Sequence, residues 1–398
     1  MLSSVGVVGG GIMGSGLARY FLAKDFRVIL IEADRYSAQK VRGRLENVLG
    51  KDVEKGKLAQ ARAENFLGHL QVSEDISRLA EAEFVIEAVT ENLSLKREIL
   101  INIEGHLSND AVLCSTTSAL PVSAIGAVLA RPDRFIGTHF FNPAHIMPLV
   151  EVIPGMDTEP DVVEKVKDFL LLYGKRPIKI KECPGFLVNR ILGALMNEAM
   201  WLLEEGAGIR ELDSSAKSIG LPMGPAALGD MVGWDVIYAS NLTLETYYGS
   251  RFEIPNLLKE LVVQRSYGVK SGNGLYDHTK NVPEPSDHLI STYQRAQKMS
   301  NEQIGQRLTS IILAESIRCL DEGIASNKDI DMAMTLGAGF TRGPLAWADE
   351  IGLKEVLENL LRYSEVNGPR FWPAPILRVH VTAGYNGPSS GRGLAGTY

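Results

Sequence analysis

Short apolar runs alternate with amphipathic stretches between the start of the chain and residue 183. Apolar runs bounded by turn residues are typical of buried strands, and apolar positions that recur with the helical period are typical of helices. Strands are expected at Val5–Val8, Val28–Ile31, Phe84–Ala88, Ala111–Ser115, Arg134–His139, Leu149–Ile153 and Pro177–Ile180. Because helical stretches separate most of these segments, the pattern predicts an α/β sheet.

Beyond Cys183 long helical stretches replace this alternation, and their sequence is repeated. The stretch 189–206 recurs as 306–323, and the stretch 271–275 recurs as 390–394. Landmarks that match at a nearly constant offset indicate a duplicated domain, whereas a solenoid would show many shorter repeats. We therefore expect two homologous all-α domains after the sheet.

A segment rich in proline at 282–287 is typical of a linker between the two copies. The predicted organisation has three parts. An α/β domain covers 1–183, the first helical copy covers 184–284, and the linker with the second copy covers 285–398.

A glycine-rich turn follows the first predicted strand. Residues 9–14 read Gly-Gly-Gly-Ile-Met-Gly, which matches the G-x-G-x-x-G spacing. In such a turn the first glycine permits the tight bend, the second lets the backbone approach a pyrophosphate, and the third lets helix and strand pack closely. The sequence therefore predicts a Rossmann-type domain whose dinucleotide contacts include Gly9, Gly11, Ile12, Met13 and Gly14.

The second predicted strand ends in Glu32. A carboxylate at this position accepts hydrogen bonds from the adenosine ribose and repels a 2′-phosphate, which favours NAD over NADP. Arg35, three residues later, argues in the other direction, because an arginine can accommodate a 2′-phosphate. NAD is the predicted cofactor.

The composition narrows the class of protein. Hydrophobic residues make up 45% and charged residues 22% of the chain, which are globular values, and the net charge of −7 does not indicate nucleic-acid binding. No apolar run reaches the roughly 20 residues that span a membrane, and the first strand begins too early to leave room for a targeting peptide. The three cysteines have no paired spacing, so we expect no disulfide, no metal site and a cytoplasmic location.

Three polar side chains stand at or just after predicted strands: Ser118, His139 and Glu151. Such positions converge on the crevice where an α/β sheet binds its ligand. A histidine can take the hydroxyl proton of an alcohol during hydride transfer, and a paired carboxylate would stabilise the imidazolium that forms. Each residue also has a structural alternative: His139 in the core, Glu151 on a solvent-facing strand and Ser118 as a helix cap.

Four segments occur together in the order and spacing of one known family. They are Thr-Ser-Ala-Leu at 117–120, His-Phe-Phe-Asn-Pro at 139–143, Leu-Val-Glu-Val-Ile at 149–153 and Pro-Gly-Phe-Leu-Val-Asn-Arg at 184–190. The chain thereby resembles the L-3-hydroxyacyl-CoA dehydrogenase family over about residues 4–280, and the second helical copy extends the likeness almost to the end. The resemblance implies NAD-dependent oxidation of L-3-hydroxyacyl-CoA to 3-ketoacyl-CoA in fatty-acid and short-chain acyl-CoA metabolism.

The resemblance also implies roles for individual residues. His139 would be the catalytic acid/base, and Glu151 would be its carboxylate partner. Ser118 and Asn189 would hydrogen-bond the reacting oxygen of the acyl-CoA substrate, although Asn189 could also be a structural side chain at a helix start. Cofactor contacts are implied for Glu32, Glu91, Lys96, Ser118, Asn142 and Lys270.

Two features depart from the family pattern. Thr116 stands beside the proposed site where the family usually has an asparagine. The residues that contact coenzyme A in the family, near the end of the first long helix, cannot be matched clearly to positions of this sequence. Lys51, Lys55 and Lys57 could meet the acidic coenzyme or form a solvated charge run.

The second copy has Gln306 in the place of Asn189 and Ser389 in the place of Lys270, and no second nucleotide fold precedes it. We therefore expect it to be structural. Single-copy members of the family dimerise through the helical domain, so residues 301–398 are expected to pack against residues 184–280 of the same chain. Such an intrachain pseudo-dimer would leave the protein a monomer or a weak homo-oligomer.

Two other functions stay open at this point. A β-hydroxyacid dehydrogenase of the 6-phosphogluconate type would carry a catalytic lysine in the first long helix of its second domain, and residues 189–200 contain no lysine. A non-enzymatic protein of the lambda-crystallin kind would share the scaffold. The combination of Ser118, His139, Glu151 and Asn189 argues against lost activity.

Overall fold

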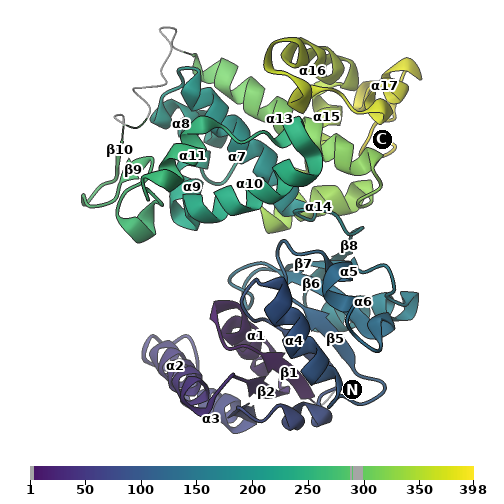
Figure 1. Ribbon diagram of the computed structural model, residues 1–398. Coiled ribbons are helices and arrows are strands. Elements are labelled where there is room, and N and C mark those ends of the chain that lie inside the picture. Colours follow the sequence, from purple (N-terminus) through teal and green to yellow (C-terminus); the bar gives the residue numbers. More distant parts are fainter. Residues whose placement is uncertain (1–3, 287–288, 290–298) are drawn as a thin grey trace. The chain divides into compact units, whose positions relative to one another are not determined.

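The computed structural model describes residues 4–286, 289 and 299–398 and divides into two compact units, Met1–Glu182 and Cys183–Tyr398 (Figure 1). None of the helices described is both long enough and apolar enough to cross a membrane. The first unit is built on a sheet, and the second is helical. An α/β Rossmann-type unit followed by a helical unit is therefore confirmed.

The first unit alternates strands and helices. Its strands are β1 (Ser4–Val8), β2 (Arg27–Ile31), β3 (Leu70–Ser73), β4 (Phe84–Glu87), β5 (Val112–Ser115), β6 (Phe135–Phe140), β7 (Leu149–Pro154) and β8 (Arg176–Lys179). Its α-helices are α1 (Ile12–Leu22), α2 (Arg35–Glu54), α3 (Gln60–His69), α4 (Leu93–Glu104), α5 (Val122–Gly126) and α6 (Pro160–Leu172). Short 3₁₀ turns lie at Ile76–Glu81 and Pro132–Arg134.

The strands form one sheet in the order β3-β2-β1-β4-β5-β6-β7-β8. Neighbouring strands are parallel except β6 and β7, which are antiparallel. The chain leaves β1 toward one side of the sheet and returns on the other side with β4, so a topological switch point lies between these two strands. Strand β3 was not predicted, because only Leu70 of its four residues is fully buried and its sequence, Leu-Gln-Val-Ser, is not an apolar run.

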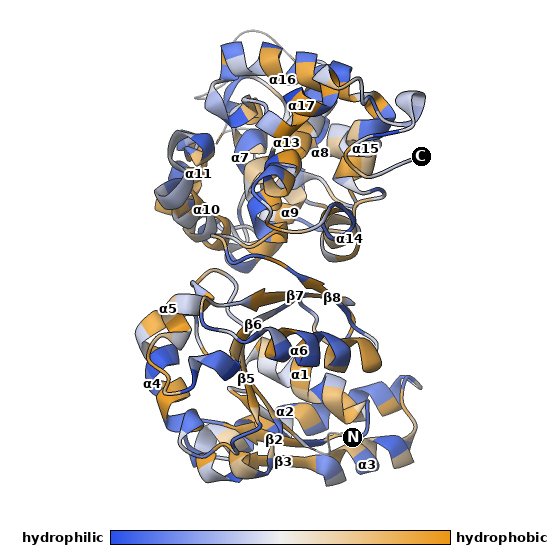
Figure 2. Ribbon diagram, turned by 90° about the vertical axis from the view of Figure 1, so that its right-hand side faces the viewer, coloured by the Kyte–Doolittle hydropathy of each residue, from blue (hydrophilic) through white to orange (hydrophobic). Residues whose placement is uncertain are grey.

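A core of apolar and aromatic side chains joins one face of the sheet to α1 and α6. Val5 and Val7 point from β1 into this core. The Phe169 ring of α6 stacks on the Phe84 ring of β4 at 4.4 Å between centroids and on Phe21 of α1 at 5.8 Å. Figure 2 shows the strands as mostly hydrophobic and the surrounding helices as two-sided. The sheet is therefore a rigid base for the loops at its edges.

The second unit contains the two helical copies. The first copy has α7 (Val188–Glu204), α8 (Ile209–Ser218), α9 (Pro225–Val232), α10 (Trp234–Tyr248) and α11 (Asn256–Val263). The second copy repeats this order as α13 (Asn301–Asp321), α14 (Asn327–Gly337), α15 (Pro344–Ile351), α16 (Leu353–Asn367) and α17 (Pro375–Thr382). A small antiparallel pair, β9 (Tyr276–Asp277) and β10 (Glu284–Pro285), is added to the first copy, so that copy is not purely helical.

Helix α13 of the second copy packs against α7 and α8 of the first copy, so residues 301–398 do pack against residues 184–280. The guanidinium of Arg190 donates to Glu315 at 2.6 Å and to Glu322 at 2.7 Å. The same pairs recur with the copies exchanged, joining Arg307 to Glu198 and Glu205. Reciprocal contacts of this kind define an isologous, two-fold interface, which here lies within one polypeptide.

Candidate active site

Most of the predicted site residues of the first unit lie along one edge of the sheet. Strands β1, β4, β5 and β6 are mutually parallel, so their carboxyl ends share this edge. Because β7 is antiparallel to β6, its first residues lie at the same edge. Ligands of open α/β sheets bind in the crevice outside such an edge.

The glycine turn between β1 and α1 has the geometry that a dinucleotide requires. Gly9 has a φ of +92°, and a Cβ there would lie 2.8 Å from the carbonyl oxygen of Ala88. A Cβ on Gly14 would lie 1.8 Å from the carbonyl oxygen of Gly9, whereas a Cβ on Gly11 would meet no atom within 4 Å. The turn is therefore closed on the protein side and open in front of the helix N-terminus, where a pyrophosphate can approach.

The two residues between Gly11 and Gly14 begin α1. Ile12 is exposed and Met13 is partly buried, so both border the open side of the turn. Arg44 of α2 donates from its guanidinium to the carbonyl oxygen of Gly10 and to the hydroxyl of Ser15, the latter at 2.8 Å. Sequence reasoning missed this cation beside the turn, because nothing in the pattern of α2 shows which side chain reaches back to α1.

Glu32 follows directly after β2, and one carboxylate oxygen accepts a hydrogen bond from the backbone N–H of Gly10 at 2.7 Å. The carboxylate is thus fixed against the glycine turn, as an acceptor for ribose hydroxyls must be. Arg35, the possible binder of a 2′-phosphate, begins α2 and is exposed.

Beneath the edge, β4, β5 and α4 share a buried polar cluster. The ammonium of Lys96 donates to both carboxylate oxygens of Glu87, at 2.8 and 3.1 Å, and the Ser115 hydroxyl donates to the same carboxylate at 2.5 Å. Glu87 is 0% and Lys96 1% exposed. Glu87 was not among the predicted residues, since it ends an apolar strand and carries no motif of its own. Lys96, a predicted cofactor contact, is engaged inside the protein.

Glu91 holds the turn that presents Ser118. One of its carboxylate oxygens accepts hydrogen bonds from the Thr117 hydroxyl at 2.6 Å and from the backbone N–H groups of Ser118 and Ala119 at 2.9 and 3.0 Å. Burial raises the pKa of this carboxyl, but the charge of Lys96 and these hydrogen bonds outweigh burial and hold the pKa below its usual value. Ser118 itself is exposed on the edge.

His139 and Glu151 form a buried pair on the antiparallel strands β6 and β7. They are direct partners in the ladder, and the Nδ1 atom of His139 lies 2.6 Å from a carboxylate oxygen of Glu151. His139 is 5% and Glu151 0% exposed, so Glu151 is not a solvent-facing strand residue. A carboxylate on Nδ1 keeps the proton of a neutral imidazole there and leaves Nε2 as an acceptor. Asn142 lies just after the end of β6 and is exposed.

The remaining predicted residues belong to the helical unit. Asn189 is the second residue of α7 and is partly buried. Lys270 lies in a short 3₁₀ turn, Val269–Ser271, is half-exposed and forms an ion pair with Asp235. The first unit thus brings together the glycine turn, Glu32, Ser118, His139 and Glu151, while the parts assigned to Asn189 and Lys270 stay predictions.

Comparison with protein families identifies both units. The family described as 3-hydroxyacyl-CoA dehydrogenase, NAD binding domain, matches residues 4–183. The family described as 3-hydroxyacyl-CoA dehydrogenase, C-terminal domain, matches twice, at residues 185–278 and 304–396. The second unit therefore contains two copies of one domain type, and the first unit is an NAD-binding domain.

A curated relative is similar to nearly the whole chain. Subunit alpha of the fatty acid oxidation complex of Shewanella amazonensis is 34% identical over 389 residues, which are 95% of this chain and 55% of that protein. The chain thus spans about half the length of this curated relative.

Solved structures extend the likeness to three dimensions. The 3-hydroxybutyryl-CoA dehydrogenase of Escherichia coli K12 has a TM-score of 0.89 at 27% identity, covering 97% of this chain and all of the other. The (S)-3-hydroxybutyryl-CoA dehydrogenase of Ralstonia eutropha is 36% identical with a TM-score of 0.68, covering 70% of this chain and all of the other. The chain belongs to the 3-hydroxyacyl-CoA dehydrogenase family.

Proposed function

We propose that the protein catalyses the reversible, NAD-dependent oxidation of L-3-hydroxyacyl-CoA to 3-ketoacyl-CoA. The observation that carries this proposal is the buried pair of His139 and Glu151 at the sheet edge that also bears the glycine turn. An acid/base group and a dinucleotide site at one edge are the two elements that an alcohol dehydrogenation needs. The proposal includes a role in fatty-acid and short-chain acyl-CoA metabolism and a cytoplasmic location.

His139 acts as the base in the direction of oxidation. Its Nε2 atom accepts the proton of the substrate's 3-hydroxyl while C3 of the substrate loses a hydride, and the C–O bond becomes a carbonyl. Glu151 accepts a hydrogen bond from Nδ1 and stabilises the imidazolium that forms. In the reverse direction the imidazolium returns the proton to the carbonyl oxygen.

The other residues bind and orient the reactants. NAD supplies the hydride acceptor when it is bound at the glycine turn, with Glu32 toward the adenosine ribose. Ser118 and Asn189 hydrogen-bond the reacting oxygen, and a donor aimed at this oxygen stabilises the charge that develops on it. Glu91, Lys96, Asn142 and Lys270 complete the cofactor site, directly or by holding the turns around it.

The competing functions differ in testable ways. The matches of both units to 3-hydroxyacyl-CoA dehydrogenase families set aside the 6-phosphogluconate type. A non-enzymatic role on the same scaffold needs no acid/base pair. Here the pair is present, and its two residues face each other in the ladder.

The deciding assay follows NADH oxidation with acetoacetyl-CoA, and then with longer 3-ketoacyl-CoA substrates. We expect turnover with NADH and a clear preference for NADH over NADPH, because Glu32 lies against the glycine turn. The His139→Ala variant provides the background rate. Absence of turnover with every chain length would refute the proposed function, and equal specificity constants for NADH and NADPH would refute the role of Glu32.

A further inference from the structure

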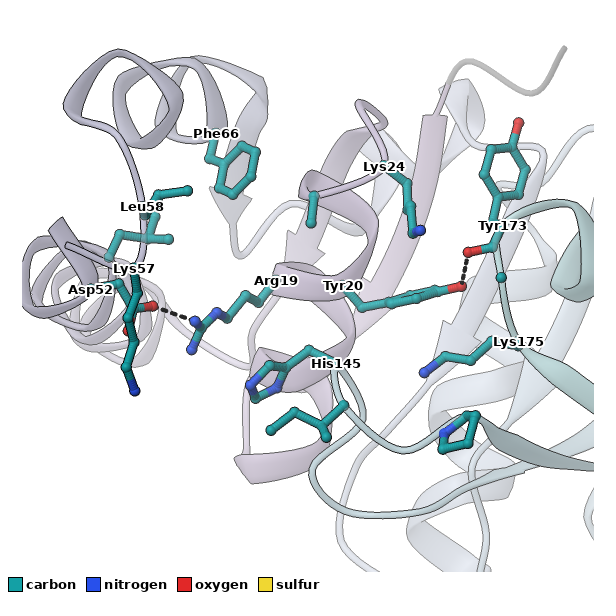
Figure 3. A pocket seen from close by; sticks show the side chains of 15 residues that line it. Arg19, Tyr20, Lys24, Asp52, Lys57, Leu58, Phe66, His145, Tyr173 and Lys175 are labelled. Atoms are coloured by element: carbon teal, nitrogen blue, oxygen red, sulfur yellow. Dashed lines mark hydrogen bonds and ion pairs between the residues drawn. The ribbon is translucent and has the colours of Figure 1, made fainter. Parts of the chain in front are cut away.

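Buried polar side chains hold loops in both units. In the first unit the ammonium of Lys175 donates to the carbonyl oxygens of Ala144 and Met147, at 2.5 and 2.7 Å, in the loop between β6 and β7 beside the pocket that Lys175 lines (Figure 3). In the second unit the carboxylate of Asp230 binds the loop that carries Lys270. This second contact bears on function, because Lys270 belongs to the proposed cofactor site.

Hydrogen-bond donors surround the carboxylate of Asp230, which comes from α9 and is 1% exposed. Its Oδ1 atom accepts from the indole N–H of Trp234 at 2.6 Å and from the backbone N–H of Leu275 at 2.9 Å. Its Oδ2 atom accepts from the backbone N–H of Tyr276 at 2.8 Å and lies 2.7 Å from Nε2 of His278. The donors fix the carboxylate, and the carboxylate in turn fixes the chain segments that donate to it.

The loop that carries Lys270 lies directly on this carboxylate. Lys270 is in a short 3₁₀ turn, and the backbone N–H of Gly268 before the turn donates to the carbonyl oxygen of Asn273 after it, at 2.8 Å. A Cβ on Gly274 would lie 2.1 Å from Oδ1 of Asp230, so no space separates the loop from the carboxylate. Because the loop is closed on itself and bound at its end, a displacement at Asp230 would move the turn that carries Lys270.

The same carboxylate also holds the ion-pair partner of Lys270. Trp234, whose indole donates to Asp230, is the first residue of α10, and Asp235 follows it. Asp235 forms an ion pair with Lys270, whose side chain is half-exposed. Asp230 therefore holds both the backbone that carries Lys270 and the carboxylate that the lysine ammonium meets.

The second helical copy contains the same kind of buried carboxylate. Asp349 of α15 stands in the place of Asp230 and is 1% exposed. It accepts from the backbone N–H groups of Leu394 and Ala395, both at 2.8 Å, and from the hydroxyl of Tyr398 at 2.9 Å. The carboxylate thus supports the fold of both copies.

The charged pair is different in the second copy. Ser389 stands in the place of Lys270, and Lys354 stands in the place of Asp235. The first copy therefore uses the shared carboxylate to hold a lysine and an aspartate, whereas the second copy has neither of them at these positions.

We infer that Asp230 is a positioning residue, whose carboxylate fixes Lys270 for contact with the bound cofactor. The inference rests on the proposed function, in which Lys270 is part of the NAD site. Lysine has a long and flexible side chain. A turn and an ion-pair partner that hold this side chain before the ligand arrives lower the entropic cost of binding.

The test measures the dissociation constant of NADH by fluorescence titration of the full chain, without an acyl substrate. The test variant is Asp230→Asn, in which an amide N–H replaces an acceptor oxygen and faces donors. The matched control is Asp349→Asn, the same change in the second copy. We expect NADH to bind roughly 3- to 10-fold more weakly to Asp230→Asn and with wild-type affinity to Asp349→Asn.

A double-mutant cycle with Lys270→Ala shows whether Asp230 acts through Lys270. Lys270→Ala alone should weaken NADH binding at least as much as Asp230→Asn does. Adding Asp230→Asn to Lys270→Ala should change the dissociation constant by less than about 2-fold, because the side chain that Asp230 positions is already absent. A general disturbance of the fold would instead weaken NADH binding equally in both backgrounds.

A milder variant, His278→Phe, gives the answer if Asp230→Asn does not fold. It removes one donor to Asp230 at a partly exposed position and leaves the two backbone donors in place. NADH binding should weaken in the same direction, and only where Lys270 is present.

Several outcomes would overturn the inference. They are equal NADH affinities for Asp230→Asn and Asp349→Asn, a loss that persists in the Lys270→Ala background, or a Lys270→Ala protein that binds NADH as tightly as the wild type. Each of them leaves the proposed function standing if the wild type turns over acetoacetyl-CoA. If the wild type turns over no 3-ketoacyl-CoA, the proposed function fails, and the NADH titrations still decide the role of Asp230.

Discussion

At the scale of single residues, the pairing of His139 with Glu151 shows what a sequence can and cannot specify. Motif order placed both residues at one sheet edge, but the alternation along a strand could not tell a buried Glu151 from a solvent-facing one. The antiparallel register decides this, because it puts the two side chains directly opposite each other, with 2.6 Å between Nδ1 and the carboxylate. Register depends on contacts between strands and is not written in either strand alone.

The His139→Ala variant should lower kcat by roughly 10²–10⁴-fold, because the hydroxyl proton then has no positioned acceptor. Affinity for NADH, measured by fluorescence titration, should change little. The matched control is His106→Ala, which removes an exposed histidine. A His139→Ala enzyme with near-normal turnover would remove His139 from the mechanism.

At the scale of elements, the sequence predicted the strands that carry apolar runs and missed the interactions between their ends. Glu87 and Lys96 come from β4 and α4 and meet in the interior together with Ser115 of β5. Lys96 was predicted as a cofactor contact because the family resemblance implies that role. Nothing in the sequence marked its partner Glu87 as a buried residue, because a carboxylate at the end of an apolar strand is usually solvated.

Replacing Lys96 by methionine should destabilise the first unit by roughly 3–5 kcal/mol, because Glu87 would then be a buried charge without its partner. Urea unfolding measures this loss. Lys167→Met is the control, since it breaks a surface pair with Glu164 and should cost about 0–1 kcal/mol. The double variant Glu87→Gln/Lys96→Met should recover part of the loss. A Lys96→Met protein as stable as the control would contradict this reading of the pair.

The turn after β5 should depend on the ionised form of Glu91. The folded protein lowers the pKa of this carboxyl, so its stabilising effect is present above the ordinary pKa near 4.3 and is lost as the pH falls through the lowered value. The melting temperature of Glu91→Gln should therefore lie below that of wild type at pH 7, and the gap should close in acid. A difference in melting temperature that stays constant with pH would show that the variant is destabilised by the altered shape of the side chain and not by the loss of its charge.

At the scale of the whole molecule, the duplication predicted that the two helical copies would pack together, and the structure shows them in one unit. The side chains at that contact were not predicted. Arg190 stands beside Asn189 in the Pro-Gly-Phe-Leu-Val-Asn-Arg motif, yet it is 0% exposed and pairs with Glu315 and Glu322 of the second copy. Offsets in a sequence reveal a repeat, but they do not show which face of each copy is buried.

Deleting residues 285–398 should expose the α7 face and leave Arg190 without both of its carboxylate partners. We expect the truncated chain to form an intermolecular dimer or to aggregate, because the same face of another chain is then the nearest complement. Light scattering after gel filtration distinguishes these states, with the full chain as reference. A truncated protein that stays a stable monomer would be inconsistent with a two-fold contact between the copies.

Reciprocal ion pairs join α7 and α13, and both helices belong to one chain. This covalent connection changes how the protein responds to dilution. A dimer of separate copies dissociates when it is dilute, so its melting temperature rises and falls with concentration. Joining the copies in one chain replaces that dependence with a fixed effective concentration, roughly in the millimolar range for a short tether. The helical unit should therefore melt at the same temperature at nanomolar and micromolar protein. Covalent joining also relieves the two halves of the need to stay identical, which is how one copy can have Asn189 while the other has Gln306.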